Sequence, residues 1–188
     1  MIGRPVLPSF DGPTVGVCLV CTGNICRSPM AEVVLREMAG RMPLPGGAPL
    51  PGGNPTLGDR LRVSSAGTGG WHQGEPMDPR AAAALASAGY RDHGHVARQF
   101  DVTAVADRVD LLVALDRRHQ QTLRSLTRWP DDRIVLLRAF DPAAGGAVDV
   151  ADPYYGGPAD FDGCLAVIEA GCRGLADALA AALVAGVG

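Results

Sequence analysis

The sequence predicts an α/β domain of three layers, in which a central four-stranded parallel sheet is covered by helices on both faces. Short apolar runs typical of buried strands alternate along the chain with longer segments of helical periodicity. The length of 188 residues fits one domain of ordinary size. A cluster of turn-forming residues follows the first apolar run, and parallel sheets bind their ligands at the carboxyl ends of the strands.

Four segments are expected to form the strands. Residues 15–20 (VGVCLV) are a continuous apolar run, as expected for a strand that is buried on both faces of a sheet. Residues 61–66 are a second candidate. Residues 110–115 (DLLVAL) are a third buried strand, and residues 133–137 are the fourth.

The first two helices have recognisable start and stop signals. We expect a helix that begins at Ser28 and Pro29, because serine is a favoured N-cap and proline fits the first helical position. Its apolar residues continue at helical spacing until Gly40. The second helix, residues 79–88, is rich in alanine and is closed by Gly89.

The other two helices follow the third and fourth strands. Residues 117–126 are expected to form the first of them. The last helix starts near Asp160, and its apolar residues recur every three or four positions as far as Leu183. Gly171 and Gly174 weaken this helix without cancelling the pattern.

Two segments are expected to lie outside the regular core. Residues 1–13 are predicted to be a flexible N-terminal tail, and residues 14–188 a single domain. Residues 43–59 contain five prolines and five glycines. This composition argues against regular structure and predicts a mobile loop insertion.

Charge and hydropathy exclude several classes of partner. The formal net charge is −3, and all 17 cationic residues are arginine, so the basic character of a nucleic-acid-binding protein is absent. No stretch approaches the roughly 20 apolar residues that cross a bilayer. The first 13 residues do not resemble a signal peptide. We therefore expect a cytoplasmic protein that binds neither nucleic acid nor membranes.

Five cysteines are present, an odd number that argues against a disulfide framework. Their spacing does not match a zinc site, so no metal is expected. Cys18, Cys164 and Cys172 are expected to behave as small buried apolar residues. Cys21 and Cys26 need another explanation.

The segment 21–28 (CTGNICRS) joins the first predicted strand to the first predicted helix. Backbone N–H groups of such a loop, with the unpaired N–H groups at the helix start, can form a cradle for an anion. Gly23 and Asn24 are residue types that tolerate the positive φ that a tightly curled loop needs. We expect a phosphate-binding loop at the end of the first strand, formed by Thr22, Gly23, Asn24, Ile25, Cys26, Arg27 and Ser28.

Two side chains of this loop are candidates for chemistry. Arg27 supplies a planar pair of donors that suits two phosphate oxygens. Cys21 would be a thiolate at neutral pH in the field of such a cradle, and so a nucleophile facing bound phosphate. The G-x-x-x-x-G-K pattern is absent, which excludes an ordinary nucleotide-binding P-loop.

Residues 17–32 (VCLVCTGNICRSPMAE) are similar to the signature of the low-molecular-weight protein tyrosine phosphatases. The similarity extends over roughly residues 15–185 and is strongest to the actinobacterial branch. It includes four further short motifs: residues 64–68 (SSAGT), 71–72 (WH), 95–99 (HVARQ) and 152–155 (DPYY).

The resemblance implies a phosphatase that works through a phosphocysteine. In that mechanism Cys21 attacks phosphorus, and Arg27 with the loop N–H groups holds the phosphoryl oxygens. Asp152 protonates the leaving phenolate and then activates water. No metal or other cofactor is implied. The implied partners are tyrosine-phosphorylated proteins, a cognate tyrosine kinase among them, and the implied inhibitors are phosphate and other oxyanions.

The resemblance also implies supporting roles for two sets of residues. One set braces the loop by hydrogen bonds: Asn24, Ser28, Ser65 and His95. Within it, the Ser28 hydroxyl can also donate to the thiolate. The other set forms an aromatic rim that grips a phenyl ring: Trp71, His72, Tyr154 and Tyr155. A core role is an alternative for one of the two tyrosines, whereas Trp71 is expected to be exposed.

Cys26 lies in the same tight loop as Cys21, so their side chains are expected to reach disulfide distance with small backbone movement. A sulfenic acid on Cys21 could be captured by Cys26 before irreversible oxidation. Cys26 is therefore expected to be a resolving thiol. The alternative is that Cys26 only packs beside the loop.

Three other functions are weighed against phosphotyrosine hydrolysis. An arsenate reductase on this scaffold needs further redox cysteines, and there is none between positions 26 and 164. Arginine-phosphate phosphatases resemble this loop but have Thr in place of Ile25 and Phe in the acid loop; Ile25 instead offers an apolar contact to an aryl ring. A phosphotyrosine-binding module would need an inactivating feature, and none is visible.

Overall fold

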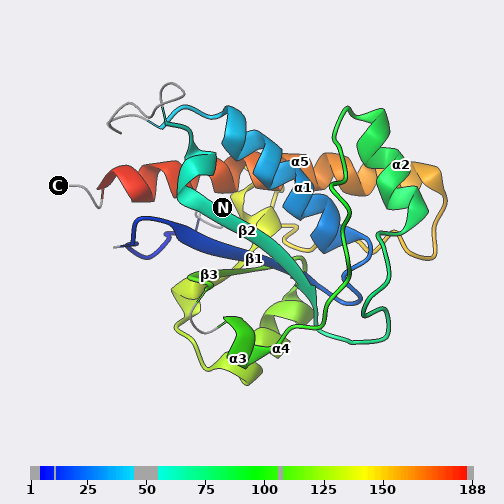
Figure 1. The fold of residues 1–188 in the computed structure, drawn as a ribbon, viewed down its shortest axis with the longest axis horizontal. Helices are drawn as coiled ribbons and strands as arrows, with labels where there is room; N and C mark the ends of the chain where they lie inside the picture. The colour runs from blue at the N-terminus through cyan, green and yellow to red at the C-terminus, as the bar shows by residue number, and fades with distance from the viewer. Residues whose placement is uncertain (1–4, 11, 45–54, 106–107, 186–188) are drawn as a thin grey trace.

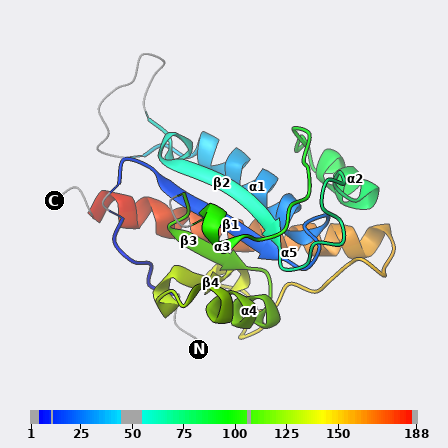
Figure 2. The same ribbon diagram turned by 60° about the horizontal axis from the view of Figure 1, so that its bottom comes forward.

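The computed structural model describes residues 5–10, 12–44, 55–105 and 108–185. Its four strands form one parallel sheet in the order β2-β1-β3-β4, which confirms the predicted fold class. Helices α1, α2 and α5 lie on one face of the sheet, and α3 and α4 lie on the other (Figures 1 and 2). The elements are β1 Val15–Cys21, α1 Arg27–Arg41, η1 Leu57–Arg60, β2 Leu61–Gly67, α2 Pro79–Ser87, α3 Val102–Val105, β3 Leu111–Ala114, α4 Arg117–Thr127, η2 Asp131–Arg133, β4 Ile134–Leu136, η3 Leu137–Phe140 and α5 Pro158–Ala185.

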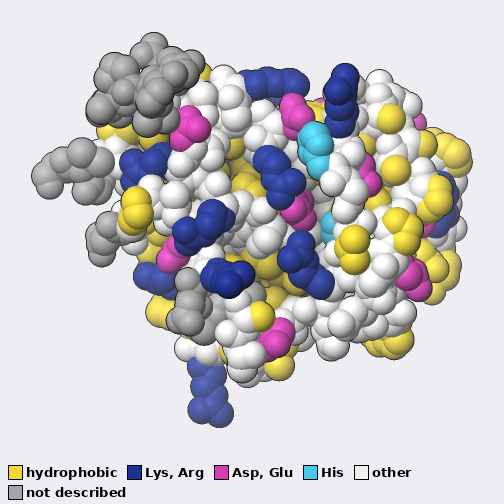
Figure 3. All heavy atoms as spheres, viewed as in Figure 1, with side chains coloured by type: hydrophobic (Ala, Val, Ile, Leu, Met, Phe, Trp, Pro, Cys, Tyr) yellow, Lys and Arg dark blue, Asp and Glu magenta, His cyan; other side chains and the backbone are white. Residues whose placement is uncertain are grey.

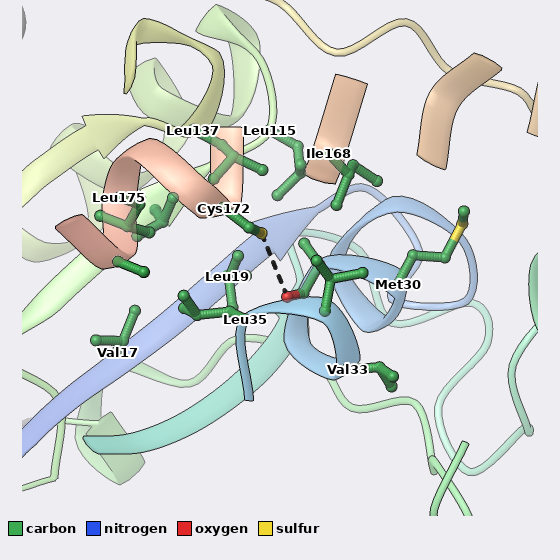
Figure 4. Packing of buried hydrophobic residues seen from close by; sticks show 14 of the residues in the cluster. Val17, Leu19, Met30, Val33, Leu35, Leu115, Leu137, Ile168, Cys172 and Leu175 are labelled. Carbon is green, nitrogen blue, oxygen red and sulfur yellow. Dashed lines mark hydrogen bonds between the residues drawn. The ribbon is translucent and has the colours of Figure 1, made fainter. Parts of the chain in front are cut away.

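Strand β1 is buried along its whole length and separates two hydrophobic cores. Side chains alternate along a strand, so Val17 and Leu19 belong to the larger core beneath α1 and α5, and Val20 belongs to the smaller core beside α4. Figure 4 shows Leu19 close to Leu35 and Cys172 in the larger core. This packing fixes the carboxyl end of β1, where the candidate loop begins.

Three cysteines are confirmed as buried packing residues. Cys18, Cys164 and Cys172 are all buried, and Cys172 makes a long S–H contact of 3.7 Å to the carbonyl oxygen of Ala31 (Figure 4). Burial raises the pKa of Cys18 and of Cys164 to about 12. These thiols therefore stay protonated at neutral pH.

The proline- and glycine-rich segment differs in part from the expectation. Its residues 45–54 lie outside the described residues. At its C-terminal end, however, η1 forms over Leu57–Arg60, so the prediction that 43–59 lacks regular structure is wrong there. The reason is local capping combined with burial: Thr56 and Asp59 cap one another, and Leu57 is fully buried.

The expected N-terminal tail is attached to the domain in its described part. The ring of Phe10 is buried in the larger core, and Arg60 donates hydrogen bonds to the carbonyl groups of Gly12 and Pro13. Burial of this ring and the two Arg60 hydrogen bonds attach the described part of the segment to the domain.

Strand β2 is the edge strand of the sheet, and its last residue, Gly67, forms a parallel bridge with Gln99. Arginine side chains lie beside the rest of that edge. Figure 3 shows the face of the molecule that carries β2, with several arginines gathered on it. Arg36, Arg62, Arg98 and Arg108 are all exposed. Charged side chains beside a free edge oppose pairing with a strand of another molecule. In the described part of the chain, no helix has the length and apolar character to cross a membrane.

Two of the three glycines of α5, Gly171 and Gly174, prove to be packing residues. A Cβ atom on Gly174 would lie 2.0 Å from the carbonyl oxygen of Phe140, and one on Gly171 would lie 2.8 Å from Cγ of Leu137. Both contacts are with η3. The glycines cost helix propensity, but they allow α5 to approach η3 closely at this point.

Gly174→Ala should therefore lower the free energy of unfolding by about 1–3 kcal/mol, because the added methyl group overlaps backbone that cannot give way easily. Gly163→Ala is the matched control in the same helix. A Cβ there meets nothing within 4 Å, so this change should raise the free energy of unfolding by about 0.5–1 kcal/mol. Urea denaturation of both variants measures the difference; equal effects would contradict the packing role.

Candidate functional site

The candidate loop lies at the carboxyl end of β1, between that strand and α1. It opens into a cavity of about 280 Å³. The structure brings the predicted nucleophile, arginine, acid and aromatic rim together around this cavity. Its lining residues are Cys21, Thr22, Gly23, Ile25, Cys26, Arg27, Trp71, His72, Asp152, Tyr154 and Tyr155.

Ser28 does not cap α1, and this corrects the sequence prediction. The N-cap residue is Cys26, and no side chain caps the helix. The Ser28 hydroxyl instead points back into the loop. It lies 3.0 Å from Sγ of Cys21 and accepts a hydrogen bond of 2.9 Å from Nδ2 of Asn24. A side chain held in this direction cannot reach the free N–H groups of its own helical turn.

Asn24 is the fully buried brace of the loop. Its φ of 58° is the left-handed conformation that was expected there. Its Nδ2 donates to Ser28 and, at 2.9 Å, to Oγ of Ser65, while its Oδ1 accepts from the backbone N–H of Arg98 at 2.9 Å. Nε2 of His95 lies 2.7 Å from the carbonyl oxygen of Asn24. These contacts stabilise a conformation that few residues adopt.

Gly23 is needed for a different reason from the expected one. Its φ is not positive; among the loop residues, only Asn24 has a positive φ. A Cβ on Gly23 would lie 2.8 Å from Cδ2 of His72, so glycine allows that ring to pack against the loop. Gly67 has a similar role at the end of β2, where a Cβ would lie 2.7 Å from the carbonyl oxygen of Thr22.

Arg27 is 3% exposed, and its guanidinium has four hydrogen-bond partners. Nη1 donates to Oδ2 of Asp116 at 3.0 Å and to the carbonyl oxygen of Val150 at 3.1 Å. Nη2 donates to Oγ1 of Thr22 at 3.2 Å and to Oδ2 of Asp152 at 2.6 Å. Two carboxylates thus compensate a charge that would be unstable if buried alone.

Asp116 and His119 are site residues that sequence reasoning missed. Burial disfavours the charged form of Asp116, but hydrogen bonds from the side chain and backbone of His119, together with the charge of Arg27, outweigh it and lower the pKa of this carboxyl well below its usual range. A signal was available: Asp116 directly follows the third predicted strand, whose carboxyl end adjoins that of β1.

The aromatic residues form an exposed rim. Trp71 is 76% exposed and Tyr155 97%, while Tyr154 is 36% exposed, so neither tyrosine has the core role left open by the sequence. The rings of Tyr154 and Tyr155 meet edge to face with centroids 5.0 Å apart, and the His72 ring lies 6.3 Å from that of Tyr154. The flat faces and edges of these rings offer apolar contact above the anion cradle.

Arg80 and Asp78 connect the loop to the segment that carries the rim. The backbone N–H of Asp78 donates to the carbonyl oxygen of Ile25 at 2.9 Å. Arg80 pairs with the Asp78 carboxylate at 2.7 Å, and its hydrogen bonds lower the pKa of that carboxyl. Arg80 also donates to the carbonyl oxygen of Gly156 and lies 5.7 Å from the ring centroid of Tyr154.

Cys26 is buried and lines the same cavity as Cys21. Burial raises the pKa of its thiol, and the nearby negative charges of Asp78, Cys21 and Asp152 act in the same direction. At neutral pH Cys26 is therefore a protonated thiol beside the candidate nucleophile.

This arrangement suits attack by sulfur on the electrophilic central atom of a bound oxyanion group. A thiol lies at the base of the cradle, a fixed cation faces it, and a carboxyl group that is 46% exposed stands at the mouth. Among the described residues, no group of three or more His, Cys, Asp or Glu side chains is placed to hold a metal ion.

Comparison with known proteins agrees with this chemistry. Residues 16–185 match the family model for low molecular weight phosphotyrosine protein phosphatases. A low molecular weight protein-tyrosine-phosphatase of Streptomyces coelicolor is 49% identical over 168 residues, which cover 86% of this chain and 92% of the relative. Low molecular weight protein-tyrosine phosphatase A of Mycobacterium tuberculosis is 46% identical over 162 residues, with coverages of 86% and 89%.

A solved structure supports the same relationship at the level of the fold. The crystal structure of YfkJ from Bacillus subtilis superimposes with a TM-score of 0.71 at 32% identity. The match covers 87% of this chain and 93% of the solved one. The chain therefore belongs to the family of low molecular weight phosphotyrosine protein phosphatases, which are cysteine-dependent hydrolases.

Proposed function

We propose that the protein hydrolyses phosphotyrosine in proteins through a phosphocysteine on Cys21. The observation that carries this proposal is that Cys21, Arg27 and Asp152 share one cavity whose mouth is aromatic. A phosphotyrosine has a flat apolar ring that Trp71 and Tyr154 can contact. Phosphoserine has no such ring and would leave the rim without a contact.

In the first step, Sγ of Cys21 attacks phosphorus and the bond from phosphorus to the tyrosine oxygen breaks. The electron pair of that bond stays on the phenolic oxygen, which takes a proton from Asp152. Arg27 and the loop N–H groups hold the phosphoryl oxygens as negative charge builds on them. The Ser28 hydroxyl, 3.0 Å from Sγ, stabilises the sulfur as thiolate and as leaving group.

The second step restores the enzyme. Asp152, now ionised, takes a proton from water as the water oxygen attacks phosphorus. The bond from sulfur to phosphorus breaks, and phosphate and the Cys21 thiolate result. A phosphoryl group competes with the Asp152 carboxylate for Nη2 of Arg27. Substrate binding therefore frees Asp152, which takes up a proton from solvent and in that form serves the leaving oxygen of the first step.

The two enzymatic alternatives have less support. Ile25 is buried in the cavity wall, an apolar contact that suits an aryl ring better than a guanidinium. An arsenate reductase would need a mobile redox thiol, but Cys164 is buried within α5. We therefore propose phosphotyrosine as the substrate class.

The proposed partners are tyrosine-phosphorylated proteins, including a cognate tyrosine kinase. Phosphate, vanadate and sulfate would compete for the cradle formed by the loop and Arg27. All five cysteines are free, which fits the reducing cytoplasm. Ser65 and His95 are proposed to hold the loop through Asn24, as their hydrogen bonds suggest.

A peptide panel tests the substrate class. The wild-type protein should hydrolyse a phosphotyrosine peptide and leave the matching phosphoserine and phosphoarginine peptides largely intact, as measured by phosphate release. Cys21→Ser should lose turnover while keeping its fold, because an alcohol at that position is not ionised. Preferred hydrolysis of phosphoarginine, or retained activity of the serine variant, would contradict the proposal.

The role of Asp152 predicts a dependence on the leaving group. Asp152→Asn should lower kcat for phenyl phosphate by about 10²–10⁴-fold, the usual size of a general-acid contribution. The loss should shrink for aryl phosphates with more acidic phenols, since these leave without a proton. Asp160→Asn, near the start of α5, is the control and should behave as wild type. A loss that is the same for all leaving groups would place the acid elsewhere.

Cys26 is proposed to protect Cys21 from irreversible oxidation. Peroxide should inactivate the wild-type protein, and dithiothreitol should restore its activity, because Cys26 captures the sulfenic acid as a disulfide. Cys26→Ser should stay active but fail to recover. Its raised pKa further predicts that capture accelerates as the pH rises above neutrality, since the attacking species is the thiolate.

Cys164→Ala is the matched control for this experiment and should recover like the wild type. Activity before peroxide, after peroxide and after dithiothreitol gives the three readings needed. Recovery of Cys26→Ser, or its loss in Cys164→Ala, would show that Cys26 is not the resolving thiol.

A further inference from the structure

Four side chains around the Arg27 guanidinium form a closed ring of polar contacts. Nη2 of Arg27 donates to Oγ1 of Thr22 at 3.2 Å, and that oxygen lies 2.9 Å from Nε2 of His119. Nδ1 of His119 lies 3.0 Å from Oδ1 of Asp116, and Oδ2 of Asp116 accepts from Nη1 of Arg27 at 3.0 Å. The ring returns to the same guanidinium through both of its terminal nitrogens.

The hydrogens can be placed around this ring with His119 in its neutral form. Arg27 occupies one lone pair of Thr22, so the Thr22 hydroxyl can donate to Nε2 of a neutral His119. The imidazole hydrogen then resides on Nδ1, which faces the ionised carboxylate of Asp116. That contact is short but poorly aligned, and buried Nδ1 has no other partner in the described structure. Asp116 is thus the group that can satisfy it.

We infer that His119 is a positioning residue, which fixes the plane of Arg27 through Thr22 on one side and Asp116 on the other. This rests on the proposed function, in which Arg27 binds the phosphoryl group. Three of the four Arg27 contacts, those to Thr22, Asp116 and Val150, remain when Asp152 moves to the leaving oxygen. The ring therefore keeps the N–H groups of Arg27 pointing in the same directions while Asp152 exchanges Arg27 for the leaving oxygen.

Two features suit His119 to this task. It is 4% exposed, so water does not compete for its ring nitrogens. Its backbone is also held in place, because His119 lies in the first turn of α4. Asp116 is the N-cap of that helix, and its Oδ1 accepts a hydrogen bond of 2.9 Å from the His119 backbone N–H. Since Asp116 has this capping role as well, its substitution would disturb α4, and His119 and Thr22 are the better residues to test.

The experiment compares Thr22→Val, His119→Asn and the double variant by their inhibition constants for inorganic phosphate. His119→Asn keeps an amide near Asp116 but withdraws the contact to Thr22. Each single variant should raise the inhibition constant about 10-fold, within the range of coupling in one hydrogen-bond network. The double variant should be no worse than either single one, because each opens the same ring. Effects that multiply would overturn the inference.

Three further readings separate positioning from folding. An inhibition constant does not depend on the fraction of protein that is folded, so a purely structural role of His119 would lower kcat and leave phosphate inhibition unchanged. That outcome would overturn the inference. His119→Gln, whose amide can reach Thr22, should recover most of the phosphate affinity. His93→Gln, at an exposed histidine, should match the wild type.

Arg27→Lys distinguishes failure of this inference from failure of the proposed function. Loss of the guanidinium should raise the inhibition constant for phosphate by about 10²-fold or more, as for removal of a preorganised donor. Unchanged inhibition in Arg27→Lys would contradict the proposed function itself. A large effect of Arg27→Lys with none in Thr22→Val and His119→Asn would leave that function standing and remove only the ring.

Discussion

A positive charge buried at the end of the central strand organises the surrounding structure. Arg27 lies almost entirely out of water, where an unpaired charge would be strongly unfavourable. Its two carboxylate partners, Asp116 and Asp152, stand 89 and 125 positions further along the chain. The parallel pairing of β1 with β3 places Asp116 beside the loop, and the segment before α5 supplies Asp152. The order of the strands thus also places a carboxylate beside the buried charge of Arg27.

The site combines a rigid base with an exposed mouth. Asn24 holds a left-handed backbone conformation at the base, and every polar atom of its side chain has a partner from the loop, β2 or the segment before α3. Trp71 and Tyr155 at the mouth are largely exposed. Buried, fully bonded groups keep one geometry, whereas exposed side chains can adapt. A phosphoryl group would therefore be held in one place while the rim accommodates different protein segments around a tyrosine.

Much of the fold was predictable because its signals are local. Continuous apolar runs such as that at β1, and alanine-rich periodicity such as that of α2, report burial and helical spacing within a few residues. The errors arose where a contact outweighed a local preference. Leu57 is buried within a segment whose composition argued against structure. The last helix formed through Gly171 and Gly174 as predicted, and Gly174 allows α5 to pack against η3.

The order of the four strands and of helices α1, α2, α4 and α5 could be predicted from the chain alone, because it depends on local neighbours; the short helix α3 was missed. The same holds for the position of the loop after the first strand and for the motif that contains Cys21 and Arg27. The groups that surround them depend on the three-dimensional packing. Ser28 turns toward the sulfur instead of capping α1, and His119 reaches Thr22 from 97 positions away. Such partners are selected by distance in space, and a pattern along the chain carries no record of that distance.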